Sequence, residues 1–313
     1  APGAAESSAA AAPSLQEEGN IWIPWNPEAM QAALDGGKPV YVDFTARWCS
    51  TCQVNKASYT DEVLAAFMRA ITSGWESATS IPSRWQSLSG IEHRMLNFLE
   101  NHDEQRIASD FFAGNGARAI PAMIVSACMN DNPVMIYFGQ EIGEQGMDTE
   151  GFSGRDGRTT IFDYWSVDSI RRWRNNGKFD DKLLTEEEKK LRTFYSRLLN
   201  LCNTEKAIRE GVFFDLTYAN LAGWVFNEHK QYAFMRKLDD ELLLIMVNFD
   251  SIPVRAAVNI PQHAFDFLGI PYNLEYNAVE LLTGNTEKLV LSPDKTTPVL
   301  LDAMNGKILK FKL

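Results

Sequence analysis

Two cysteines separated by two residues are the first feature of the sequence that could do chemistry. Cys49 and Cys52 lie in the stretch RWCSTCQ, directly after the apolar run VYVDFTA, which reads as a buried strand. A helix that begins at such a pair supplies partial positive charge and free N–H groups that stabilise a thiolate. Cys49 is then the nucleophile, and Cys52 resolves the mixed disulfide. The pair therefore predicts thiol–disulfide exchange.

A zinc site and a chance spacing are the alternative readings of the same cysteine pair. A structural zinc ion needs a second pair of ligands. The two remaining cysteines, Cys128 and Cys202, stand alone on apolar stripes. We therefore interpret Cys128 and Cys202 as small core residues, and we expect no metal and no cofactor.

A second polar group occurs in the stretch FLENHDEQR, residues 98–106. The preceding residues RMLNFLE, 94–100, read as a strand that ends at Asn101, His102 and Asp103. Taken alone, this group is typical of a turn with a cap at the end of a strand. The alternative is a sugar-cleaving site, in which carboxylates act on a glycosidic bond.

Length, composition and charge restrict the kind of protein. A chain of 313 residues predicts two or three domains, and 45% hydrophobic residues are enough for buried cores. The 30 basic and 41 acidic residues give a net charge of −11, which disfavours nucleic acids and anionic membranes as partners. The longest strong apolar run, LLLIMV at 242–247, is far shorter than the roughly 20 residues of a membrane-spanning helix.

Helical periodicity and start signals predict several helices. Asn26 can cap a helix with Pro27 at its first position, Pro121 is expected to start another, and Thr185 with Glu188 forms a capping box. The helices are expected over 26–34, 61–74, 105–114, 117–129 and 185–203.

Strand patterns occupy the remainder of the chain. PVMIYFGQE, 133–141, reads as a single strand, and from about residue 212 short alternating runs separated by turn residues predict an antiparallel β domain. Residues 1–19 are mostly Ala, Ser, Pro and Glu, which predicts a flexible linker.

The stretch WIPWNPEAMQAALDGGKPVYVDFTARWCSTCQVNK resembles the start of the C-terminal, thioredoxin-like domain of DsbD-type thiol:disulfide interchange proteins. The resemblance covers about residues 13–68. It implies that Cys49 and Cys52 are the catalytic pair, that other thiol–disulfide proteins are partners, and that the chain is bacterial and periplasmic or extracellular. No signal peptide is visible, and the chain begins with Ala, so we expect a processed product or a fragment.

The motif MLNFLENHDEQR resembles the fourth sequence region of the α-amylase family of glycoside hydrolases, and the similarity covers about residues 71–313. The family implies a (β/α)₈ barrel with this motif at the end of strand seven, and retaining cleavage of α-glucosidic bonds in an α-glucan or oligosaccharide. It also implies that Asp103 is a catalytic carboxylate. His102 and Asn101 are then substrate-binding residues, His102 through the sugar ring and Asn101 by fixing the loop.

The rest of that catalytic machinery is not found in the sequence. Retaining hydrolysis needs a nucleophile and a general acid about 5–5.5 Å apart, and in the family both precede this motif. Neither has a match in residues 20–70, where Asp43 lies inside the predicted strand and Asp61 and Glu62 begin a helix. Glu141 resembles a residue that fixes a loop.

The sequence therefore predicts a multi-domain α/β plus all-β chain that fuses two family fragments. We expect a linker (1–19), a partial thioredoxin-like segment (20–70), the C-terminal remnant of a (β/α)₈ barrel (71–205) and an antiparallel β-sandwich (206–313). Recombination or misassembly of a gene is the leading explanation of the fusion. The predicted function is that of an α-amylase-type, carbohydrate-active protein that is catalytically incomplete. The alternatives are a thiol:disulfide oxidoreductase and a structural role for the β domain.

Overall fold

The structure is a computed structural model that describes residues 26–36, 59–60, 62–88, 90, 95–147, 155–159, 167–221, 223 and 225–313. The chain divides into two compact units, Ala1–Val54 and Asn55–Leu313. The described element of the first unit is helix α1, Pro27–Asp35, and the Asn26 Oδ1 accepts a hydrogen bond from the Ala29 N–H at 2.9 Å. The predicted start of this helix is therefore confirmed. The strand and helix predicted around Cys49 and Cys52 lie outside the described residues.

Three short parallel strand segments lie next to one another at the start of the second unit. Strand β1, Tyr59–Thr60, pairs in parallel with β2, Met95–Leu96, and Asn97 forms a parallel bridge to Val134. Helices separate these segments along the chain. Consecutive strands of a (β/α)₈ barrel pair in this way, with helices between them.

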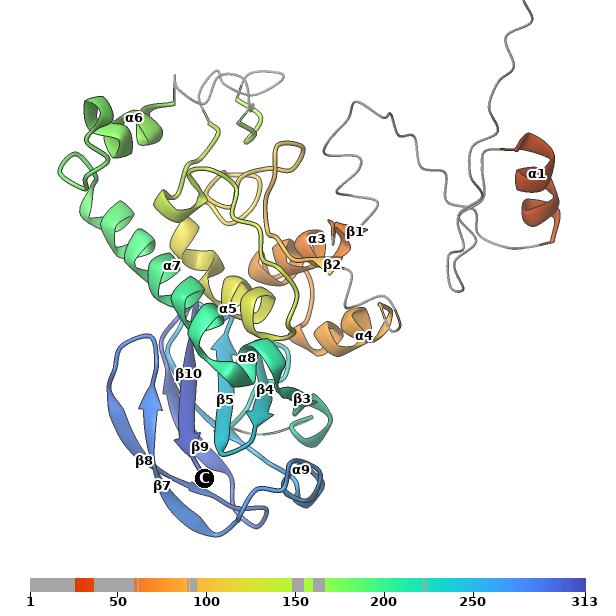
Figure 1. Cartoon of the computed structure of the whole chain (residues 1–313), viewed down its shortest axis with the longest axis vertical. Coiled ribbons are helices and arrows are strands. Elements are labelled where there is room, and N and C mark those ends of the chain that lie inside the picture. The colour runs from red at the N-terminus through yellow and green to blue at the C-terminus, as the bar shows by residue number, and fades with distance from the viewer. Residues whose placement is uncertain are drawn as a thin grey trace, which may run out of the picture. The chain divides into compact units, whose positions relative to one another are not determined.

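The helices of the second unit cover these segments and continue toward the C-terminal sheet (Figure 1). Among the described residues, the α-helices of the second unit are α3 (Glu62–Thr72), α4 (Ile81–Gln86), α5 (Ile120–Cys128), α6 (Asp168–Arg174), α7 (Glu186–Thr204), α8 (Lys206–Glu210) and α9 (Gln262–Leu268). The predicted helices at α3, α5 and α7 are confirmed. The predicted capping box of Thr185 and Glu188 is present in full.

Two sequence-based expectations in this unit are wrong. Residues 105–114 form turns instead of a helix, because the Arg106 N–H bonds to the Gly157 oxygen at 2.6 Å and the chain reverses at Gly114. The strand expected over 133–141 is limited to the bridge at Val134. Gly139, with φ 82°, turns the chain into a short 3₁₀ helix at Gln140–Ile142.

The C-terminal part is an antiparallel β domain, as predicted. Its described strands are β3 (Val212–Asp215), β4 (Gln231–Leu238), β5 (Glu241–Asn248), β6 (Val254–Val258), β7 (Leu274–Glu280), β8 (Thr286–Leu291), β9 (Thr297–Leu301) and β10 (Asn305–Lys312). One sheet has the order β3-β4-β5-β10-β7-β8, and the other pairs β6 with β9. Strand β10 thus lies between β5 and β7, with Ile308 opposite Ile245.

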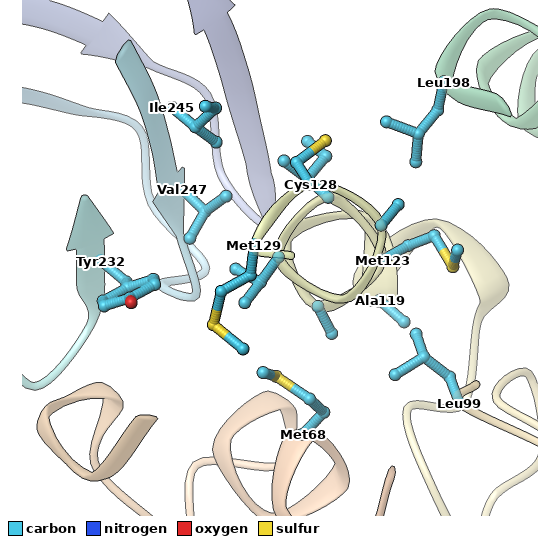
Figure 2. Close-up of a cluster of buried hydrophobic side chains, with 14 of the residues drawn as sticks. Met68, Leu99, Ala119, Met123, Cys128, Met129, Leu198, Tyr232, Ile245 and Val247 are labelled. Atoms are coloured by element: carbon cyan, nitrogen blue, oxygen red, sulfur yellow. The ribbon is translucent and has the colours of Figure 1, made fainter. Parts of the chain in front are cut away.

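Both faces of the larger sheet are buried along β4 and β5. One face packs β6, β9 and α9 against residues such as Met235 and Leu244 of the sheet. The other face packs on the helices, and Figure 2 shows α5 between Met68 of α3, Leu198 of α7 and the sheet residues Ile245 and Val247. In the described part of the chain, no helix has the length and apolar character needed to cross a membrane.

Close packing at Gly306 and a buried arginine join the helices to the sheet. A Cβ at Gly306 would lie 2.7 Å from Val247 Cγ1 and 2.9 Å from Ile124 Cδ1, so α5 approaches β10 where glycine leaves room. Arg236 of β4 is buried, and its guanidinium donates hydrogen bonds to main-chain oxygens of Ala207, Met129 and Ile208. These bonds satisfy carbonyls at the C-terminal end of α5 and in α8.

Replacing Arg236 by alanine should destabilise the second unit strongly. The change removes three charge-assisted hydrogen bonds and leaves buried carbonyl oxygens without a donor, which costs about 3 kcal/mol of unfolding free energy. Urea unfolding followed by circular dichroism measures this loss. Lys237→Ala is the matched control, because the Lys237 ammonium bonds to Asp239 in an exposed hairpin. Equal midpoints for the two variants would contradict the prediction.

Candidate functional site

The candidate site is the loop 101–105, which follows β2 at the carboxyl end of the parallel strand segments. The end of β2 is fixed by main-chain bonds from Asn97 to Pro133, at 2.9 Å, and from Met135 to Asn97, at 2.8 Å. The Asn97 side chain also donates to the Ser126 oxygen of α5 at 2.8 Å. Ladder bonds and a buried amide therefore determine where the loop starts.

Asn101 shapes the loop from within. Its buried side-chain oxygen accepts hydrogen bonds from the N–H groups of Asp103, at 2.8 Å, and Glu104, at 2.9 Å. This is an Asx-turn, in which the side chain takes the place of a turn carbonyl. The geometry orients Asp103 outward from the end of the strand.

His102 and Asp103 are adjacent and open to solvent. The His102 Nε2 lies 3.2 Å from the Asp103 Oδ2, and the two side chains are 43% and 68% exposed. A ligand can therefore reach both groups without displacing protein. Together they offer one carboxylate and one imidazole, which suit hydroxyl-rich ligands.

A buried ion pair closes the base of the loop. Glu100 and Arg106 flank the loop, their side chains are 1% and 0% exposed, and Arg106 Nη1 lies 3.2 Å from Glu100 Oε1. The second carboxylate oxygen of Glu100 accepts the Ile107 N–H. Burial raises the pKa of Glu100, and the Arg106 guanidinium opposes this shift by lowering it. The ion pair thereby joins the two ends of the loop.

Aromatic rings surround the Arg106 guanidinium. Its centre lies 4.7 Å from the Tyr137 ring and 5.4 Å from the Phe138 ring, and Nη2 donates to the Phe138 oxygen at 2.6 Å. The Tyr137 hydroxyl donates to the Thr159 oxygen at 2.7 Å, and burial raises the pKa of Tyr137 to about 12. The segment around Val134 thus holds Arg106 in place.

Arg69 of α3 fixes the outer side of the loop. Its Nη1 donates to the Gln105 side-chain oxygen at 2.9 Å, and its Nη2 forms an ion pair with Glu104. The guanidinium also lies over the Phe112 ring at 5.4 Å. Arg69 belongs to the second compact unit, as does the loop that it contacts.

The structure brings Asn101, His102 and Asp103 together, and it describes neither Cys49 nor Cys52. Sequence reasoning missed Glu100, Arg106 and Arg69. An acidic and a basic residue directly flanking a polar loop after an apolar strand were the available signal. Among the described residues, no group of three or more His, Cys, Asp or Glu side chains could hold a metal ion.

Two cavities of the described part lie away from this loop. One, of about 680 Å³, lies among residues of α6, α7 and the turns near Gly116 and Gly143; the other, of about 510 Å³, lies between α7 and the β domain. Inside the first, Arg172 pairs with Glu188, and the Glu144 carboxylate accepts the Ser169 hydroxyl. Neither of these two cavities is lined by Asn101, His102 or Asp103.

The Glu100 carboxyl should make stability depend on pH. Its raised pKa means that the folded chain keeps the proton to a higher pH than the unfolded chain does. The free energy of unfolding therefore falls as pH rises from the ordinary value of 4.5 through the raised pKa. Glutamine does not titrate, so the Glu100→Gln variant should gain stability relative to the unaltered chain over the same pH range. Urea unfolding at a series of pH values tests this, and a constant difference would contradict it.

Replacing Arg106 by methionine should destabilise the chain more as pH rises, whereas Glu100→Gln gains stability relative to the unaltered chain over the same range. Methionine keeps an apolar stem but removes the cation, so the ionised Glu100 is left buried and unpaired, at a cost of about 3 kcal/mol near neutral pH. The cost should shrink near the pKa of Glu100, where protonation removes the charge. Arg118→Met, at an exposed position, is the control. Thermal unfolding measured at neutral pH and at a pH below the raised pKa of Glu100 tests this prediction. A loss of stability that is equal at the two pH values would count against the ion pair.

Comparison with protein families gives two matches. Residues 21–70 match a thioredoxin-like family, and residues 53–211 match the catalytic domain of α-amylases. The matches overlap over 53–70, the stretch that contains β1 and Arg69. The chain therefore joins a thioredoxin-like part to an amylase part, as the two sequence resemblances predicted. No curated protein has a sequence that matches the chain significantly.

Solved structures with a similar fold include α-amylases. The α-amylase of Geobacillus thermoleovorans complexed with acarbose is 17% identical, with a TM-score of 0.53 over 81% of this chain and 48% of that one. The maltogenic α-amylase AmyB of Thermotoga neapolitana is 13% identical, with a TM-score of 0.55 over 81% and 50%. AmyP in complex with maltose is 16% identical, with a TM-score of 0.55 over 81% and 50%. The chain thus spans about half the length of these structures, and the likeness is one of fold.

Proposed function

This chain belongs to the α-amylase family, and from that premise we propose that it binds α-glucan chains without hydrolysing them. The observation that carries the proposal is the Asp103 carboxylate, which Asn101 directs outward at the end of β2. We assign Asp103 to the sugar hydroxyls at the reacting ring, His102 to a hydrogen bond with the same ring, and Asn101 to fixing the loop. The family assignment supports a glycoside hydrolase-type protein, and similar structures have been solved with acarbose and maltose.

The barrel interpretation is part of this proposal. We interpret β1, β2 and the segment at Val134 as the last three strands of a (β/α)₈ barrel, because they pair in parallel in chain order. These three described segments would form one side of a binding groove. The domain boundaries predicted at residues 70/71 and 205/206 stay predictions. The second compact unit of the structure begins at Asn55.

The proposed lack of hydrolysis follows from the chemistry of the site. Asp103 and His102 can stabilise charge and hydroxyl positions around one ring, but retaining cleavage also needs a nucleophile and a proton donor. Residues 20–70 offer no motif for either. Hydrolysis by unassisted water is slower by many orders of magnitude. Binding needs neither group, since hydrogen bonds to the sugar suffice for it.

Purified full-length chain should bind maltohexaose weakly, with a dissociation constant on the order of 1 mM. Asp103→Ala should weaken binding roughly tenfold, because a hydrogen bond to a charged group is lost. Asp110→Ala removes an exposed carboxylate outside the loop and is the matched control. Isothermal titration calorimetry measures binding, and release of reducing ends from soluble starch measures hydrolysis. Equal affinity in the two variants would overturn the binding site, and turnover lost in Asp103→Ala would overturn the proposed inactivity.

A second candidate function is thiol–disulfide exchange through Cys49 and Cys52, which the thioredoxin-like match over 21–70 supports. Thiol–disulfide proteins would then be partners, and a periplasmic or extracellular location would suit both functions. If a helix starts at Cys49, its thiol should be more acidic than an ordinary cysteine.

The rate of Cys49 alkylation should therefore rise through an inflection well below about pH 8.5. The reaction can be followed by mass spectrometry of the tryptic peptide 48–56, which contains both cysteines of the pair. Cys49→Ser is the control that assigns the reactive thiol. An inflection at or above the ordinary value would count against the redox function and leave the carbohydrate function untouched.

A further inference from the structure

Two cysteines that neither proposed function uses lie close together where α5 and α7 pack. Cys128, the last residue of α5, is fully buried, and Cys202, in the last turn of α7, is partly exposed. The Cys202 thiol donates a hydrogen bond to the main-chain oxygen of Ala127, which directly precedes Cys128, at 3.4 Å. Figure 2 shows Cys128 on the part of α5 between Ile245 and Leu198, the residue one turn before Cys202. Both thiols are free.

The two thiols also interact with each other. The neighbouring Cys202 thiol raises the pKa of Cys128, and the neighbouring Cys128 thiol lowers the pKa of Cys202. Burial raises the pKa of Cys128 further. The partly exposed thiol is therefore the more acidic one, and it lies next to the main chain of Ala127, the residue before the buried Cys128. This order of reactivity fits an attacking thiol and a resolving thiol.

We propose that Cys128 and Cys202 form a disulfide that joins α5 to α7 when the chain meets a small-molecule disulfide such as oxidised glutathione. The Cys202 thiolate attacks one sulfur of the oxidant, and the first glutathione thiolate leaves. The Cys128 thiolate then attacks the Cys202 sulfur, and the second glutathione thiolate leaves. Two protein thiols are oxidised to one disulfide, one disulfide is reduced to two thiols, and the two protons pass to the leaving thiolates.

The position of the pair determines what such a bond would do. Helix α7 packs against α5 and the 3₁₀ turn Gln140–Ile142, and it leads through α8 into the β domain. A bond between their last turns would fix the two helices against each other. It would also restrict the unfolded chain by closing the long loop between residues 128 and 202.

The test uses the full chain incubated with oxidised glutathione, blocked with N-ethylmaleimide, and digested with trypsin. Peptides 119–155 and 198–206 should appear joined, about 2 Da lighter than the two reduced peptides together, because oxidation removes two hydrogens. Thermal unfolding of the oxidised chain should also shift upward by about 5 °C. Cys202→Ser should abolish both effects, whereas Cys52→Ser should retain them.

Several outcomes would overturn the proposal. Blocked thiols at both positions after oxidation, glutathione attached to each cysteine, or a link from Cys128 or Cys202 to the peptide 48–56 would each do so. The peptide map is made on the unaltered sequence, so it decides even where Cys202→Ser folds poorly. The result bears on neither carbohydrate binding nor the Cys49 reaction, because the experiment measures a different peptide pair.

Discussion

The complete burial of helix α5 is the constraint on which the rest of the second unit depends. Every residue from Pro121 to Cys128 is buried, so the helix has no face that tolerates water. It needs α3, α7 and the large sheet around it, and each of these buries its own apolar side in doing so. The Ser126 oxygen additionally accepts the Asn97 amide, which couples the same helix to the end of β2. Packing of one helix therefore fixes the candidate loop and the β domain together.

The loop itself shows how charge is used where apolar packing ends. Glu100 and Arg106 are desolvated, which is costly, and their mutual attraction with two aromatic rings around the guanidinium offsets part of that cost. What the arrangement supplies is a defined loop conformation. Arg69 of α3 adds a second, partly buried ion pair with Glu104 on the outer side of the loop. His102 and Asp103, the polar residues that can meet a ligand, form the exposed tip of this loop. The Glu100–Arg106 pair holds the two ends of the loop, and Arg69 holds its outer side.

Much of the fold could be predicted from local sequence, and the failures have physical causes. The cap of α7 and the start of α5 are decided within a few residues, so Thr185 and Pro121 were sufficient signals. Residues 105–114 have helical periodicity but turn, because the Arg106 N–H bonds to the Gly157 oxygen, far along the chain. The motif identified Asp103 and its neighbours, whereas the Arg106 guanidinium that pairs with Glu100 packs against Tyr137 and Phe138, more than thirty residues later. Local pattern carries no information about such partners.

The strand order of the large sheet has a consequence for how the chain folds during synthesis. Strands β7 and β8 join the sheet through β10, which follows them in the chain and lies between β7 and β5. The ribosome delivers the chain from its N-terminus, so β3, β4 and β5 emerge before β10. At that stage the edge of β5 to which β10 later binds is unoccupied. Until Asn305–Lys312 leaves the exit tunnel, that edge of β5 and the hairpin of β7 and β8 have no native partner in the sheet. Nascent chains are therefore exposed to intermolecular pairing at β5 for the whole interval in which about sixty residues are translated, several seconds at about 5–20 residues per second.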